Sequence, residues 1–191
     1  MGKKTAPGRG LVSKYLRKTE AGNYVILLGL LLISCVIMFH DYLFGNQIMI
    51  FNDIGSDTWQ QYIMNYTSIV NHLRDGSFSL WDFTNGLGVN MFNFNLFDPF
   101  LVLLYGIGFL LGPAHMLIYI NVIQVLKILA AGLAFYWFLS QFSFSSQAKL
   151  IASYAYGLNG FLLVWGQHYQ FGTAVTVSYT HLRAHETAAN L

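Results

Sequence analysis

MLIYINVIQVLKILAAGLAFYWFL, the stretch from Met116 to Leu139, decides the fold class of this chain. As an α-helix it is long enough to cross the ~30 Å hydrocarbon core of a bilayer. Lys127 is its one charged residue, and the small residues between Ala130 and Ala134 allow close packing between membrane helices. We therefore predict a transmembrane helix over residues 114–140 that packs against other helices.

The composition of the whole chain agrees with a membrane protein. It is 55% hydrophobic and only 9% charged, whereas soluble domains carry about 25% charged residues. The net charge is +2 and the basic residues cluster before the first apolar segment, a pattern that sets membrane orientation and does not predict a nucleic-acid partner. A single cysteine excludes an intrachain disulfide. We predict an all-α, polytopic membrane helical bundle.

Two further apolar segments predict spans, residues 23–44 and residues 149–166, the second with Gly157 and Gly160 as packing points. The basic tail at residues 1–22 is expected in the cytoplasm by the positive-inside rule. A cleaved signal peptide is the alternative for the first segment. That segment is longer than the usual ~7 to 15 apolar residues, however, and no small-residue cleavage pattern follows it. We expect a multi-pass protein with a cytoplasmic N-terminus.

The external loop that follows, residues 45–113, is expected to carry an amphipathic helix. Apolar residues recur at three- and four-residue steps over residues 58–73, which is typical of a helix with one buried face. Thr58 with Gln61 has the form of a capping box at its start, and Asp75-Gly76 supplies a stop. Such a helix is predicted to lie on the membrane surface or against the bundle.

Residues 99–111 form a shorter apolar segment that ends before Gly112-Pro113. Its length is more typical of an interfacial or re-entrant segment than of a span. A spanning helix is the alternative, and it would reverse the topology of every later segment. We favour the interfacial or re-entrant placement.

The polar stretch from Asn52 to Tyr62, NDIGSDTWQQY, holds the candidate catalytic residues. The chain has only eight acidic residues, and Asp53 and Asp57 stand four positions apart here. A carboxylate can act as a general base, and the positive end of the following helix dipole favours negative groups. Asp53 precedes the helix and is slightly preferred as the base, while capping of the helix is the alternative role for either residue.

Other polar residues are candidates for binding a substrate. Lys127 inside a span costs about 2.5 to 3.5 kcal/mol on insertion scales, so a functional role is the default hypothesis. It shares a stripe of three-residue spacing with Asn121 and Gln124, and pairing inside the bundle is its alternative role. The candidate substrate-binding residues are Gln61, Arg74, Lys127 and His168.

The last residues, 178–191, do not match the apolar chain before them. His181 and His185 stand four apart beside Glu186, but the order of a HExxH zinc motif is absent, so no metal site is predicted there. The run SYTHLRAHET instead resembles translated sequencing-adapter sequence. It predicts a non-native tail on an N-terminal fragment, which we expect to be inactive alone.

Five motifs occur in a specific combination within about residues 10–177. They are the stretch from Asn52 to Tyr62, Leu80-Trp81, Asn85-Gly86-Leu87-Gly88, Asp98-Pro99 and Ser153-Tyr154-Ala155-Tyr156-Gly157. Together with the basic tail and first span, they resemble the N-terminal part of the bacterial YfhO family, whose members are several times longer than this chain.

The resemblance implies a multi-span glycosyltransferase of the GT-C type in the bacterial cell membrane. Such enzymes take a sugar from a polyprenyl-phosphate carrier outside the cytoplasm, and the implied acceptor is a cell-envelope polymer such as teichoic acid. The partners are therefore a lipid-linked sugar donor, that polymer and membrane lipid.

An acidic residue in the first external loop of GT-C enzymes is catalytic or binds metal. The resemblance carries this role to Asp53 or Asp57 and allows a divalent metal, while no other cofactor is expected. It also implies that His168 lies outside, near the site. A transporter or flippase and a non-catalytic envelope assembly protein are the alternatives.

Overall fold

The structure is a computed structural model that describes residues 9–45, 47, 57–77, 81–83, 86–91, 98–164, 166 and 171–176, with side chains from residue 20 onward. The helices are α1 (Arg9–Met38), α2 (His40–Leu43), the π-helical turn η1 (Thr58–Ile63), α3 (Met64–Asp75), α4 (Pro99–Leu111), the 3-10 turn η3 (Pro113–His115), α5 (Met116–Leu139), α6 (Ser146–Gly157) and α7 (Gly160–Val164). Strands β1 (Trp81–Asp82) and β2 (Val89–Asn90) form a small antiparallel hairpin. The predicted all-α membrane class is confirmed.

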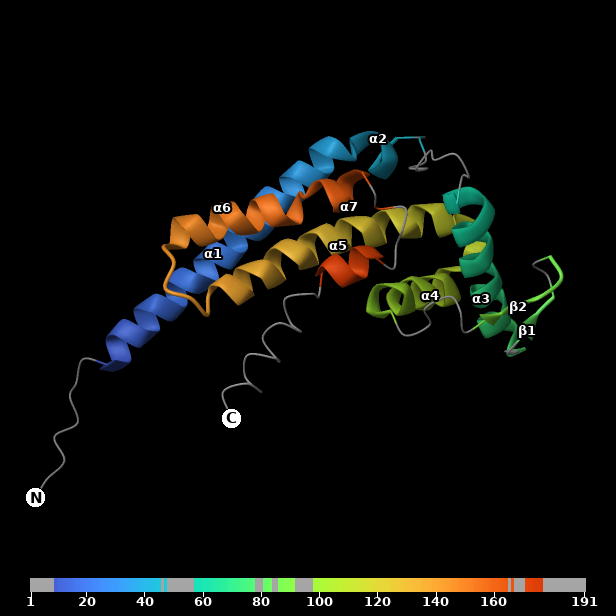
Figure 1. The fold of residues 1–191 in the computed structure, drawn as a ribbon, viewed down its shortest axis with the longest axis horizontal. Coiled ribbons are helices and arrows are strands. Elements are labelled where there is room, and N and C mark those ends of the chain that lie inside the picture. Colours follow the sequence, from blue (N-terminus) through green and yellow to red (C-terminus); the bar gives the residue numbers. More distant parts are fainter. Residues whose placement is uncertain are drawn as a thin grey trace, which may run out of the picture.

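Helices α1, α5 and α6 pack together along the long axis of the molecule (Figure 1). Within the described part of the chain, two segments are long and apolar enough to cross a membrane, Glu20–Met38 and Pro113–Leu139. They overlap the two spans predicted over residues 23–44 and 114–140. The buried residues between these helices are Leu27, Leu31, Cys35, Phe39, Ile128, Ala131, Tyr136 and Leu162.

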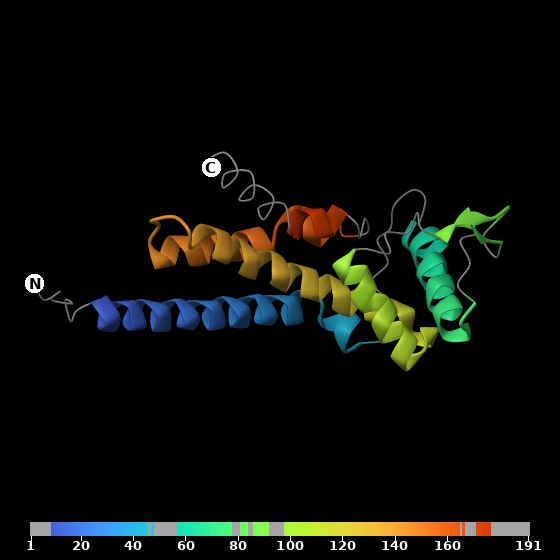
Figure 2. The same ribbon diagram turned by 90° about the horizontal axis from the view of Figure 1, so that it is seen from below.

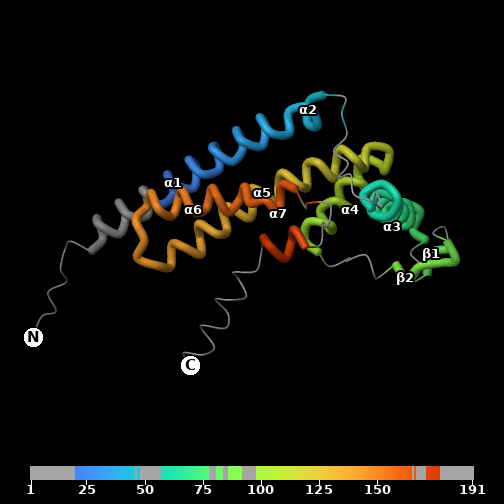
Figure 3. The backbone as a smooth tube through the Cα atoms, turned by 45° about the horizontal axis from the view of Figure 1, so that its top comes forward, coloured from blue at the N-terminus to red at the C-terminus, as the bar shows by residue number. Residues whose placement is uncertain are grey.

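The other elements gather at the end of the bundle away from the N-terminus, which we call the loop end (Figure 1). It comprises α2, η1, α3, the hairpin and α4. Helix α3 runs across the direction of α1 and α5 (Figure 2), and the hairpin lies beyond α3 (Figure 3). Helix α4 packs on both α3 and α5. Their shared core includes Tyr66, Ile69, Leu104, Tyr105, Met116 and Ile120.

The amphipathic helix predicted over residues 58–73 is present as η1 and α3. Its end is as predicted, because Gly76 adopts the left-handed conformation (φ +65°) and donates its N–H to the His72 carbonyl. The predicted capping box is wrong. Asp57 precedes η1 without a side-chain capping bond, and the fully buried Thr58 hydroxyl has no hydrogen-bond partner among the residues that the structure describes. The apolar face of η1 packs in the core with residues of α4 and α5, and Thr58 is buried as well.

Helix α4 has the bounds predicted for the short apolar segment, residues 99–111. Asp98 is its N-cap, and one carboxylate oxygen, Oδ1, accepts hydrogen bonds from the N–H of Phe100 (2.9 Å) and of Leu101 (3.1 Å). Pro99 occupies the first turn, where its missing N–H costs nothing. The interfacial or re-entrant depth of this helix in a bilayer stays a prediction.

The span predicted over residues 149–166 is divided in the structure. Helix α6 ends at Gly157 and α7 starts at Gly160. The side chain of Asn159 makes the new start, because its Oδ1 accepts from the N–H of Leu162 at 3.0 Å. The N-terminal tail also differs from the prediction, because α1 begins at Arg9 rather than after residue 22.

A polar cluster joins α1, α5 and α6 at the end opposite the loop end. The Lys149 ammonium lies 2.6 Å from a Glu20 carboxylate oxygen. The Tyr136 hydroxyl donates to the other Glu20 oxygen at 2.8 Å and accepts from the Asn23 amide at 2.9 Å. Each polar group of this buried edge therefore has a partner from another helix, as burial requires.

Glycines allow α1, α5 and α6 to meet closely. A Cβ added to Gly132 would lie 2.6 Å from a methyl of Leu31, and one added to Gly157 would lie 2.9 Å from the other methyl and 3.2 Å from the Ile128 carbonyl oxygen. The predicted packing role of Gly157 is confirmed. Gly160 has open space around it, so its predicted packing role is wrong.

Substituting Gly157 tests this contact. Gly157→Ala is expected to destabilise the bundle by about 1–3 kcal/mol, since the added methyl overlaps Leu31 and meets backbone that cannot rotate away. Gly160→Ala is the matched control and should stay within about 0.5 kcal/mol of the parent. Thermal unfolding of the detergent-solubilised protein measures both. Equal stability of the two variants would contradict the close packing of α1, α5 and α6.

Candidate functional site

The first candidate base, Asp53, lies outside the described residues, but Asp57 is placed at the start of η1. Asp57 is half-buried and Gln61 is exposed, so both face away from the core that takes up Thr58 and Tyr62. Single π-helical turns inside longer helices occur frequently at functional sites. The start of this helix therefore presents a carboxylate and an amide at the loop end.

In the ranges that the structure describes, no three His, Cys, Asp or Glu side chains lie close enough together to hold a metal ion. The divalent metal allowed by the family resemblance stays a prediction, because Asp53 is not among those ranges.

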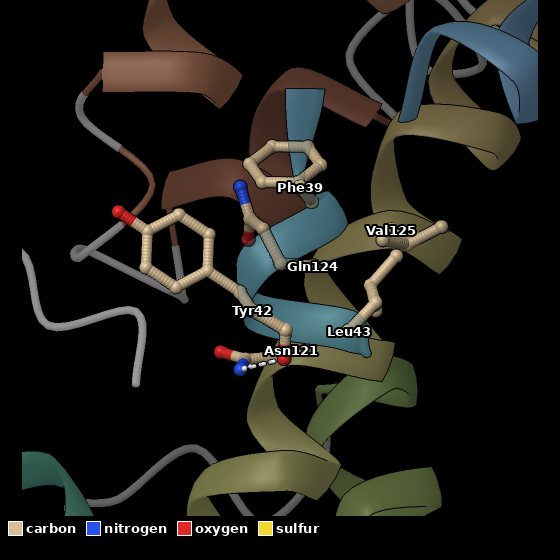
Figure 4. Close-up of a pocket in the computed structure, with 6 residues that line it drawn as sticks. All are labelled: Phe39, Tyr42, Leu43, Asn121, Gln124 and Val125. Atoms are coloured by element: carbon tan, nitrogen blue, oxygen red, sulfur yellow. Dashed lines mark hydrogen bonds between the residues drawn. The ribbon is translucent and has the colours of Figure 1, made fainter. Parts of the chain in front are cut away.

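The amide pair of the predicted polar stripe connects α5 to two different elements. Asn121 donates to the backbone carbonyl of Tyr42 on α2 at 3.4 Å, and Gln124 donates to the carbonyl of Leu162 on α7 at 2.6 Å. Both amides are buried, beside Phe39 and the side chains of α2 (Figure 4). The pocket that both amides line has no room for a water molecule, and within the described part of the chain the buried Gln124 carbonyl oxygen has no hydrogen-bond partner.

Lys127, the third member of the stripe, is fully buried at 0% exposure. Its ammonium lies 5.6 Å from the centroid of the Phe100 ring, at the first turn of α4. The Asp98 carboxylate that caps this turn is near enough for its charge to act on Lys127 and on the Tyr105 hydroxyl. Burial raises the pKa of Tyr105, and Asp98 adds to the effect, so this phenol stays neutral. A buried lysine in a membrane bundle is a candidate functional residue by default, and the Asp98 carboxylate is the charged group that acts on it here.

Arg74 is exposed at the end of α3, where its guanidinium donates to the carbonyl of Phe109 at 2.7 Å. A cation at the C-terminal turn of a helix is favourable, so this bond ties α3 to the end of α4. Lys127 lies by Phe100, nine residues earlier on α4, which corresponds to roughly 14 Å along the axis. The two predicted cations therefore do not meet at one site, and a substrate role for Arg74 stays a prediction.

Helices α3 and α4 run in the same direction. The rings of Tyr66 and Tyr105 lie 5.8 Å apart, and a Cβ added to Gly108 would lie 2.7 Å from Val70. A later residue of α3 thus contacts a later residue of α4. The hydrogen bond from Arg74 to the Phe109 carbonyl, near the C-terminal ends of both helices, follows the same order.

It follows that the starts of the two helices lie toward the same end. Asp57 begins the first helix, while Asp98 and the neighbouring Lys127 mark the start of the second. Asp57 and Lys127, two of the sequence-predicted site residues, therefore both lie toward the starting end of this helix pair. His168 and the tail at residues 178–191 lie outside the described residues.

Two acidic residues with clear structural roles were missed by the sequence reasoning. Asp98 had a usable signal, a carboxylate directly before a proline at the start of an apolar run. Asp82 had none, because its partners come from α3. It is 1% exposed, accepts a 2.5 Å hydrogen bond from the Ser68 hydroxyl and lies 3.7 Å from the His72 ring nitrogen. Asp82 therefore anchors the hairpin to α3.

The comparison with known families gives one match. A sequence model of the family described as "Bacterial membrane protein YfhO" matches residues 25–172, which is most of the chain. No curated protein and no solved structure matches the chain. The matched region includes most of the first candidate span, all of the second, η1, α3, the hairpin and α4.

The hairpin anchor can be tested with one substitution. Asp82→Ala is expected to destabilise the hairpin and α3 by about 1–3 kcal/mol, because it removes a buried carboxylate that accepts the hydrogen bond of the part-buried Ser68 hydroxyl. Asp41→Ala, at an exposed carboxylate on α2, is the control and should have little effect. Limited proteolysis between α3 and α4, with thermal unfolding, provides the measurement. Unchanged protease resistance in Asp82→Ala would show that the hairpin is held by other contacts.

Proposed function

This chain belongs to the YfhO family of bacterial membrane proteins, and we propose on this basis that it is part of a GT-C-type glycosyltransferase. The proposed reaction moves a sugar from a polyprenyl-phosphate carrier to a cell-envelope polymer such as teichoic acid, on the outer face of the membrane. The observation that carries the proposal is the fully buried Lys127 ammonium, placed at the end of the α3–α4 pair where Asp57 begins the surface helix.

The apolar surface of α1 supports a position in lipid. Val25, Ile33 and Ile37 are between 60% and 72% exposed on this helix, which is unfavourable in water and ordinary against lipid chains. The basic residues before Glu20 favour a cytoplasmic start for α1. The loop end would then face outward, where a lipid-linked donor and a wall polymer are both accessible.

The chemistry assigns complementary tasks to the two kinds of charge. The oxygen of an acceptor hydroxyl attacks the anomeric carbon of the sugar while the bond from that carbon to the phosphate oxygen breaks. The phosphate leaves with the electron pair, and the hydroxyl proton passes to a carboxylate, with Asp53 the first choice and Asp57 the second. A positioned base typically contributes about 10²- to 10⁴-fold in rate.

The cation assists the leaving group. As negative charge grows on the departing phosphate oxygen, the Lys127 ammonium stabilises it more strongly inside the apolar bundle than it would in water. Gln61, exposed one turn after Asp57, suits a hydrogen bond to a sugar hydroxyl. Arg74 and His168 are proposed as further substrate contacts.

A transporter or flippase is the second candidate function. The break between α6 and α7 lies beside α5, where Gln124 bonds to α7, and transporters place substrate sites at broken helices with nearby polar groups. In that case transport would depend on the stripe of α5 and not on Asp53 or Asp57.

The carboxylates provide the direct test of sugar transfer. Asp53→Asn and Asp57→Asn are introduced into the full-length gene, and the sugar content of the cell-wall polymer is measured at matched protein levels. Loss of the base is expected to lower transfer by about 10²- to 10⁴-fold in at least one variant. Asp41→Asn, on the exposed α2, should leave it unchanged. Normal glycosylation in both test variants would refute the enzyme assignment and favour transport or assembly.

Lys127 gives an independent test, because function and stability should change in opposite directions. Lys127→Met keeps the length of the side chain and removes a buried charge, so thermal stability is expected to stay equal or rise. Sugar transfer should fall by about tenfold or more as the leaving phosphate loses its cation. Transfer assays on membranes and thermal unfolding in detergent measure the two effects. A stable and fully active Lys127→Met variant would remove Lys127 from the site.

A further inference from the structure

We propose that the exposed face of η1 and α3 is the binding surface for the acceptor, and that the ligand it takes is an uncharged, hydroxyl-rich segment of polymer such as a polyol or glycan chain. The inference rests on the proposed function, because it supplies the acceptor for that reaction. Nothing in the sequence motifs assigns a role to this face beyond its first turn.

The surface is continuous along the helix. Residues that alternate by three and four positions from Asp57 share one side, and none of them is buried: Asp57, Gln61, Met64, Ser68, Asn71 and Asp75. The opposite side, which includes Tyr62, Tyr66, Ile69 and Val70, is buried. At 1.5 Å per residue the exposed face is roughly 25 Å long. A polymer lying along it would pass the Asp57 carboxylate at one end.

The other end of the face is a built pocket. A surface pocket of about 360 Å³ lies there, lined by Met64, Thr67, Ser68, Asn71, His72, Asp75 and Ser77. The buried Asp82 holds its Ser68 hydroxyl at 2.5 Å, and the His72 ring nitrogen Nδ1 lies 3.1 Å from the Ser77 carbonyl oxygen. Several of the lining groups are therefore fixed in position before a ligand arrives, which lowers the entropic cost of binding.

The chemistry of the lining selects the class of ligand. Hydroxyls, an amide, an imidazole and the Asp75 carboxylate all accept or donate hydrogen bonds, as polyols and sugars require. Two carboxylates, Asp75 in the lining and Asp82 behind it, oppose a phosphate. Arg74, the nearest arginine in sequence, is bonded to the Phe109 carbonyl. The pocket therefore favours the hydroxyl-bearing part of a polymer over its anionic groups.

The test uses the full-length protein in detergent, titrated with two probes of equal length, a neutral polyglycerol oligomer and a poly(glycerol phosphate) oligomer. The variant combines Thr67→Val and Asn71→Ala, and Gln147→Ala, an exposed amide on α6, is the control. Loss of two hydrogen-bonding side chains should weaken binding of the neutral oligomer by about tenfold. The KM for the polymer acceptor should rise similarly while kcat stays unchanged, because neither residue contacts the reacting atoms.

Each outcome decides between the two proposals. If the double variant binds the neutral oligomer as tightly as the parent, the proposed surface is wrong. It is also wrong if Gln147→Ala weakens this binding as much as the double variant does. If only the poly(glycerol phosphate) oligomer binds, and the double variant loses it, the ligand class is wrong. If the neutral oligomer binds as expected but the parent protein transfers no sugar, the surface stands and the proposed glycosyltransferase reaction fails.

Discussion

Polar side chains buried in an apolar bundle must find partners, and this constraint fixes how the helices of the protein meet. Helix α5 carries several of these groups. Asn121 bonds to α2, Gln124 to α7, and Tyr136 to Glu20 of α1. Apolar contacts alone would tolerate rotation of α5, whereas a lost hydrogen bond in lipid has no water to replace it. The directional bonds therefore select one arrangement of neighbours, and the candidate site inherits its position from them.

The elements that could be predicted are those whose signals are local. Asp98-Pro99 and Gly112 bracket α4 at its observed bounds, and Gly76 ends α3 because only a residue at ease with positive φ can close that turn. The period of the apolar residues predicted the buried face of α3. The break at Asn159 was missed although Gly157, Asn159 and Gly160 give a local turn signal, because the surrounding segment is apolar and long enough to be taken for one span.

The site was predicted in its residue types but not in its arrangement. Asp57 and Lys127 were singled out from composition and spacing, yet their common location depends on α3 and α4 running in parallel, which is a tertiary fact. Asp82 was invisible because a carboxylate in an aromatic loop gives no sign of a hydroxyl partner fourteen residues earlier. The wide turn of η1 likewise has no sequence signature, although it directs Thr58 inward and leaves Gln61 outside.

The ion pair of Glu20 with Lys149 has a consequence for how the protein enters the membrane. The two residues are separated by 129 positions, so α1 is synthesised long before its partner exists. During that interval Glu20 also lacks Tyr136, its other hydrogen-bond donor. A carboxylate without partners stays hydrated, which holds this part of α1 at the edge of the membrane. Only when α6 emerges does Lys149 neutralise this carboxylate. This end of the bundle therefore closes only after α6 has been made.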